Sequence, residues 1–166
     1  VLGSSEAGVA HLTDAACRTF AQEIANYCEA YDLDGVFFDD EYTYSWNHPG
    51  LTSPSTDRAA RLCFETKMAM PDKMVTCYIY SRTYGFYKKI EGMEPGDFVD
   101  YAISDYGSWD YEDCYLGMER NQVAPCSANF ASSYARWTAT QNNLQRVRNE
   151  GFGGFMVYAG IRLLLR

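Results

Sequence analysis

The sequence predicts an α/β domain in which helices alternate with the strands of a parallel sheet. An amphipathic helical pattern over residues 14–31 leads, through a very short connection, into an apolar strand at residues 33–39. Residues 35–38 contain no polar side chain, as expected for a strand buried on both faces. A second helical segment precedes residues 75–80, which are rich in β-branched and aromatic side chains. Strands that alternate with helices favour a parallel sheet with right-handed crossovers. The 166 residues contain no linker or internal repeat, so they form one domain with its own core.

In the first half of the chain, specific residues mark where the predicted helices and loops begin and end. Residues 1–12 are expected to form a loop, and Thr13 with Asp14 supplies the N-cap of the first helix. Residues 42–54 form a second loop rich in Asn, Pro, Gly and aromatic residues, directly after the first complete strand. The next helix starts at Ser55 or Thr56 and ends before Pro71.

The second half is more irregular. It is predicted to begin with a strand at 75–80, a loop with a short helix at 81–90, turns at 91–97 and a strand at 98–104. A further strand is expected at 122–128, within the irregular stretch 110–129. A helix at 135–149, closed by Gly151, precedes the last strand at 153–158.

Three acidic residues follow one another at the end of the first complete strand: Asp39, Asp40 and Glu41. Burying so much like charge is costly, so we expect them at a strand end that faces a wet cleft. Because side chains alternate along a strand, Asp39 and Glu41 share one face, with Cα atoms roughly 6–7 Å apart, and Asp40 points to the other. Two carboxylates on one face can divide acid and base roles between them.

Composition narrows the classes of function. The net charge of −8 argues against nucleic-acid and anionic-membrane partners, and no apolar run is long enough to span a bilayer. Aromatic residues make up 16% of the chain, including 14 tyrosines, which fits either core packing or a sugar-stacking cleft. The six cysteines show no metal-binding spacing; we expect mostly buried free thiols, with disulfides left open. His11 and His48 are expected at the surface.

Residues 33–42, Leu-Asp-Gly-Val-Phe-Phe-Asp-Asp-Glu-Tyr, resemble the D-G-x-D-x-D-x-E motif of family 18 glycoside hydrolases. The Asp-Asp-Glu-Tyr ending is most similar to the bacterial endo-β-N-acetylglucosaminidase branch, the endoglycosidase H/F type. Residues 97–109 resemble a later strand of that family with its loop, and residues 151–158 resemble its final strand.

The resemblance implies a (β/α)8 TIM barrel. Residues 1–166 would be a single family 18-like catalytic domain that starts at the end of the third strand, with the N-terminal strands absent from this chain. A partial barrel would leave sheet edges open, so the functional unit is expected to be larger.

The resemblance also implies a substrate-assisted, retaining hydrolysis, without metal or cofactor. Glu41 would be the general acid, Asp39 would orient the substrate's acetamido N–H, and Tyr106 would donate its hydroxyl to the acetamido oxygen. Phe37 stands where the motif has its middle Asp, which we interpret as a mark of the subfamily. The residues expected to bind substrate are Phe37, Tyr42, Tyr80, Ser104, Asp105, Trp109 and Tyr158; Trp109 and Tyr158 are as compatible with the core.

The implied activity is endo-β-N-acetylglucosaminidase, cleaving the GlcNAc-β-1,4-GlcNAc bond of the N-glycan core. A chitinase of the same family and a non-catalytic glycan-binding barrel are the alternatives, and the intact Asp39 and Glu41 argue against the second. The expected partner is an N-glycan or another GlcNAc-containing oligosaccharide. We expect a bacterial monomer that is secreted, periplasmic or on the cell surface, although no signal peptide is visible in the chain.

Overall fold

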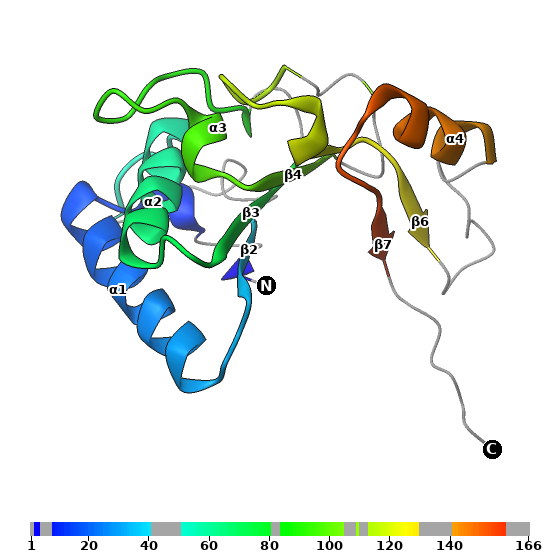
Figure 1. The fold of residues 1–166 in the computed structure, drawn as a ribbon. Helices are drawn as coiled ribbons and strands as arrows, with labels where there is room; N and C mark the ends of the chain where they lie inside the picture. The colour runs from blue at the N-terminus through cyan, green and yellow to red at the C-terminus, as the bar shows by residue number, and fades with distance from the viewer. Residues whose placement is uncertain are drawn as a thin grey trace.

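The computed structural model describes residues 2–3, 8–40, 51–80, 84–104, 109, 113–129 and 141–158. In this part of the chain, five parallel strands form a sheet in the order β1-β2-β3-β4-β5, which is also their order in the sequence. Helices α1 and α2 pack on each other along one face of this sheet, and β6 pairs with β7 beside α4 in a smaller parallel sheet (Figure 1). The predicted α/β fold with a parallel sheet is confirmed.

The bounds of the elements are β1 Leu2–Gly3, η1 Val9–His11, α1 Asp14–Ala30, β2 Gly35–Asp39, α2 Thr56–Ala69, β3 Met74–Ile79, α3 Pro95–Phe98, β4 Tyr101–Ser104, η6 Arg120–Gln122, β5 Val123–Ala124, β6 Ser127–Asn129, α4 Gln141–Glu150 and β7 Met156–Tyr158.

The two long helices begin where their capping residues predict. The Thr13 hydroxyl accepts the Ala16 N–H at 3.2 Å, and the Ser55 hydroxyl accepts the Asp57 N–H at 3.2 Å. Each cap satisfies a backbone donor that has no partner within its own helix. The apolar face of α1, with Cys17 and Ile24 among its buried residues, joins the main core.

Several boundaries differ from the sequence prediction. The strand expected at 98–104 starts at Tyr101, because Pro95 and a capping box between Glu94 and Asp97 form the short helix α3. The strand expected at 122–128 is divided into β5 and β6, which belong to different sheets, on either side of Pro125.

Three further segments were expected to be loops or helices. Residues 1–12, expected to be a loop, contain β1 and η1. The helix expected at 135–149 is described from residue 141, as α4, and residues 130–140 lie outside the described part. In the 81–90 segment, residues 81–83 lie outside the described part, and Phe86 bridges to Tyr115.

The two faces of β2 have different surroundings. Val36 and Phe38 are buried against the helices, whereas Phe37 and Asp39 on the opposite face are half-buried. Burial on both faces was therefore a wrong expectation for the described residues, because α1 and α2 cover only one face of the sheet (Figure 1). We call the face that carries Phe37 and Asp39 the inner face.

Two sequence expectations concern buried polar and thiol groups. All six cysteines lie in the described residues, and each is buried and free, as predicted. His11 was expected at the surface but is only 7% exposed. Its Nδ1 lies 2.5 Å from the Thr52 carbonyl oxygen, so it connects η1 to the segment that precedes α2.

Candidate active site

Asp39 is the last residue of β2, at the carboxyl end of the sheet. Its side chain is half-buried, and its Oδ1 is shielded from solvent and has no hydrogen-bond partner among the described residues. A buried carboxylate oxygen without a partner is costly, so such a group calls for a specific explanation, for example a catalytic role or a bound water or ion. Asp39 is therefore available to accept a hydrogen bond from a bound molecule.

The neighbouring Asp40 faces the opposite way. Its Oδ2 accepts the backbone N–H of Ala10 at 3.1 Å, which attaches η1 to the end of β2. The predicted alternation of these two acids is confirmed. Asp40 has a structural role on the helix-covered face, and only Asp39 of the pair faces the inner side.

The inner face beneath Asp39 is aromatic. Phe37 meets Tyr78 of β3 edge-on, with ring centroids 6.5 Å apart. Tyr80 directly follows β3 and comes two residues after Tyr78, so the two side chains share a face. The Tyr80 ring meets the Tyr84 ring edge-on, with centroids 5.5 Å apart. Sequence reasoning named Phe37 and Tyr80 but missed Tyr78 and Tyr84. The period-2 pattern of residues 75–80 could have indicated Tyr78.

Ser104 does not face the inner side. The register pairs Ile79 with Ser104, and both side chains lie on the face of the sheet that the helices cover. The Ser104 side chain is fully buried, and its hydroxyl donates to the Ala124 carbonyl at 3.1 Å. Its expected contact with substrate is corrected to a structural hydrogen bond between β4 and β5.

Trp109 also packs away from the inner face. Its ring meets Phe152 edge-on at 5.3 Å, and the Arg146 guanidinium lies 4.0 Å from its centroid. It packs against the small core cluster that includes Val123 and Val147. Of the two interpretations of Trp109, the structure supports packing.

The remaining predicted site residues are less fully described. Glu41, Tyr42, Asp105 and Tyr106 lie outside the described residues. Tyr158 ends β7, and only its backbone is described. Of the predicted site, the structure therefore places Asp39, Phe37 and Tyr80 on the same face of the sheet.

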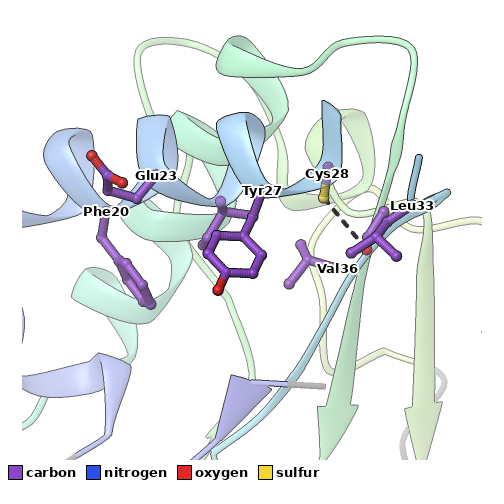
Figure 2. Close-up of a pocket in the computed structure, with 8 residues that line it drawn as sticks. Phe20, Glu23, Tyr27, Cys28, Leu33 and Val36 are labelled. Carbon is purple, nitrogen blue, oxygen red and sulfur yellow. Dashed lines mark hydrogen bonds between the residues drawn. The ribbon is translucent and has the colours of Figure 1, made fainter. Parts of the chain in front are cut away.

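A sizeable apolar groove lies elsewhere, between α1 and the start of β2 (Figure 2). Its volume is about 390 Å³, and Phe20, Tyr27, Leu33 and Val36 are among the residues that line it. Glu23 is the one acidic residue in this lining. The groove is next to the amino end of β2, whereas Asp39 is at the carboxyl end, so it is separate from the candidate site.

The described part of the chain contains no group of three or more His, Cys, Asp or Glu side chains placed to hold a metal ion. None of the helices in that part is long and apolar enough to cross a bilayer.

Comparison with known proteins shows which enzymes this chain resembles. No protein-family model matches the chain. It is 44% identical over 163 residues to endo-β-N-acetylglucosaminidase F1 of Elizabethkingia meningoseptica, an alignment that covers 96% of this chain and 47% of that protein. The chain is a relative of the endo-β-N-acetylglucosaminidases. The recognition made from residues 33–42 is confirmed.

Solved structures agree with this relationship. EndoBT-3987 of Bacteroides thetaiotamicron, crystallised with a Man5GlcNAc product, superposes with a TM-score of 0.81 at 36% identity, covering 96% of this chain and 37% of that one. A second structure of this endoglycosidase holds a Man9GlcNAc2Asn substrate, with a TM-score of 0.80. A chitinase from Rhizomucor miehei shares the fold at 11% identity, with a TM-score of 0.61 and coverage of 89% and 70%. The chain spans about half the length of the curated endo-β-N-acetylglucosaminidases it matches.

Proposed function

We propose that this chain belongs to an endo-β-N-acetylglucosaminidase that hydrolyses the GlcNAc-β-1,4-GlcNAc bond of the N-glycan core. The observation that carries the proposal is the alignment with endo-β-N-acetylglucosaminidase F1 over nearly the whole chain, including the acidic strand end. The unpartnered, buried Oδ1 of Asp39 supports it, because the proposed reaction needs an acceptor there.

In the proposed mechanism, the N-acetyl group of the substrate is the nucleophile. The carboxylate of Asp39 accepts the acetamido N–H, orients the group and offsets the positive charge that develops on it. The acetamido oxygen attacks the anomeric carbon while Glu41 donates a proton to the leaving oxygen, which gives an oxazolinium intermediate. Tyr106 donates its hydroxyl to the acetamido oxygen. Glu41 then takes a proton from the attacking water, and the configuration at the anomeric carbon is retained.

The aromatic inner face supplies further support. Phe37, Tyr78 and Tyr80 form an apolar floor next to Asp39, on which the C–H face of a sugar ring can pack. Phe37 also removes the acid that would otherwise lie beneath Asp39. In the proposed mechanism Asp39 therefore works without a carboxyl partner at the position two residues before it.

We also propose that the functional unit is a (β/α)8 barrel of which this chain is a part. The parallel strands follow chain order with helices on one face, as in such barrels. The open apolar groove beside α1 and β2 (Figure 2) is of the kind that a neighbouring β/α unit would cover. The half-length match to the curated relatives agrees with this proposal.

The test is a deglycosylation assay on the complete protein, with a high-mannose glycoprotein and chitin oligomers as parallel substrates. We expect the glycoprotein to lose its glycan and keep one GlcNAc on each asparagine, measured by intact mass. Glu41→Gln is the matched control, and it should release nothing from either substrate.

Other outcomes favour the alternatives. Release from chitin oligomers without any change in the glycoprotein would assign a chitinase. Binding of the glycan without turnover, equal in wild type and Glu41→Gln, would assign a glycan-binding barrel and overturn the enzymatic proposal.

A further inference from the structure

Two cysteine thiols are in contact inside the main core, where α2 packs on β3. The Sγ atoms of Cys63 on α2 and Cys77 on β3 lie 3.5 Å apart, and each residue is only 2% exposed. Cys17 and Cys28 behave differently, because each of these thiols donates to a backbone carbonyl, at 3.6 and 3.7 Å. Cys63 and Cys77 thus present their sulfur atoms to each other across the contact between a helix and a strand.

The distance between the two sulfur atoms is close to that of a covalent bond. A disulfide has an S–S length of about 2.0 Å, so the atoms need to approach by about 1.5 Å. A cavity of about 30 Å³ lies beside them, lined by both cysteines and by the stacked rings of Phe86 and Tyr115. Space of this size, about that of one water molecule, leaves room for the two side chains to rotate toward each other.

Cys77 lies at the level of the candidate active site, on the opposite face of the sheet. The register pairs it with Phe38, which directly precedes Asp39 on β2. The next residue on β3 is Tyr78, whose ring contacts Phe37 on the inner face. A covalent bond from Cys77 to α2 would therefore fasten, from the helix-covered side, the strand that borders Asp39.

Burial makes this pair slow to react in the folded protein. It raises the pKa of the Cys63 thiol well above its ordinary value, and the hydrogen bond with Cys77 adds to the rise. Thiol–disulfide exchange needs a thiolate and access for the oxidant, and the closed core provides little of either. The bond would thus form while the chain folds, and the same burial would afterwards protect it from reductants.

We propose that Cys63 and Cys77 form a disulfide when the protein folds in the presence of a disulfide oxidant, and that this bond fastens α2 to β3. One thiolate of the pair attacks the oxidant R–S–S–R, which gives a mixed disulfide and releases R–S⁻. The other thiolate attacks the cysteine sulfur of the mixed disulfide and releases the second R–S⁻. The two cysteines lose two protons and two electrons in total, and the oxidant takes them up as two R–SH molecules.

The first test counts thiols and needs neither activity nor a variant. The complete protein is refolded with reduced and oxidised glutathione, alkylated in denaturant and digested with trypsin without reduction. Cys63 falls in the tryptic peptide 62–67 and Cys77 in the peptide 74–82, each with a single cysteine. We expect mass spectrometry to find these two peptides as one linked species that separates after dithiothreitol is added. Recovery of both peptides alkylated, or of either linked to another cysteine, would overturn the proposal.

The second test compares the Tm of protein refolded with glutathione and of protein refolded and kept in dithiothreitol. The wild type should lose about 5–10 °C on reduction, because the loop between two residues 14 positions apart is no longer closed. Cys77→Val, which keeps a buried apolar side chain of similar size, and Cys63→Ala should each have the same Tm under both conditions.

Cys28→Ala is the matched control for this test. Its thiol is also buried, at 2% exposed, but it donates to the Gly35 carbonyl and not to another sulfur. The Cys28→Ala protein should therefore keep the full difference between the two conditions. Equal Tm values for oxidised and reduced wild type would contradict the proposed fastening of α2 to β3.

Discussion

The ring of Phe37 meets the ring of Tyr78 edge-on, with centroids 6.5 Å apart, on the inner face of the sheet. Phe37 is two residues before Asp39 on the same strand, so the two side chains share a face. The position where the family motif has its middle Asp is therefore part of an apolar floor that extends across two strands.

The contact between these rings should be measurable as a coupling energy. In a double-mutant cycle of Phe37→Ala and Tyr78→Ala, we expect the two losses in free energy of unfolding to couple by about 0.5–1.5 kcal/mol, because edge-on aromatic pairs gain beyond their buried area. Urea unfolding measures it. Phe37→Ala with Tyr101→Ala is the control, since β3 lies between these residues, and it should be additive. A Phe37–Tyr78 coupling no larger than the control would contradict the prediction.

Asp39→Asn should reduce hydrolysis of the glycan by at least about 100-fold, because an amide cannot offset the charge of the oxazolinium ion. The variant should still accept a preformed sugar oxazoline as donor, since that substrate has already passed the assisted step. Rates of glycan release and of transfer from the oxazoline check both parts. Asp34→Asn, at an exposed position before the same strand, is the control. Normal hydrolysis in Asp39→Asn would refute the assigned role.

Gly35 tolerates no side chain where β2 starts. A Cβ at this residue would overlap the carbonyl oxygen of Met74, and it would lie 2.7 Å from the carbonyl carbon. We expect Gly35→Ala to lower the free energy of unfolding by about 3 kcal/mol, because β2 and β3 must separate locally. Gly154 has a similar φ, +153° against +157°, but nothing within 4 Å of the added atom. Chemical unfolding of Gly35→Ala and Gly154→Ala should show a clearly smaller loss in the second.

Asp100 connects three segments at the amino end of the sheet. Its Oδ2 accepts the Val75 N–H at 2.7 Å, and both its oxygens accept from Lys67 Nζ at 3.0 Å. Asp100→Ala should lower the free energy of unfolding by about 1.5–3 kcal/mol, because a backbone donor and a partly buried ammonium lose their acceptor. Asp72→Ala, in an exposed turn, should change it by less than about 0.5 kcal/mol. Equal losses in thermal or urea unfolding would show that the Asp100 contacts are not stabilising.

Burial, with smaller contributions from Asp14 and Glu65, raises the pKa of the Cys17 thiol from 9.0 to about 11. The folded state thus holds this proton more tightly than the unfolded chain. Its contribution to stability is complete below pH 9 and is lost as the pH rises toward 11. Unfolding under reducing conditions at several pH values should therefore show a shallower alkaline decline for Cys17→Ala than for wild type. Parallel curves for the two proteins would contradict this.

Several site assignments could be predicted from local sequence, and others could not. The opposite orientations of Asp39 and Asp40 follow from the period of a strand, and the Asp40–Ala10 hydrogen bond confirms them. The same alternation assigns Ser104 to one of the two faces of its strand. Only its pairing with Ile79 shows that this face is the one that the helices cover. Trp109 is a similar case, because its partner Arg146 is distant in the sequence and no local pattern connects them.

The sequence by itself determined the resemblance to the endo-β-N-acetylglucosaminidases, the acidic strand end and the helix caps, because these depend on residue type and short-range spacing. Only the tertiary structure decided which face of the sheet the helices cover and that Phe37 rests on Tyr78. It also decided that Ser104 bonds to the Ala124 carbonyl and that Trp109 packs against Phe152 and Arg146. These features depend on strand register and on contacts between segments far apart in the chain, and a sequence read locally does not contain them.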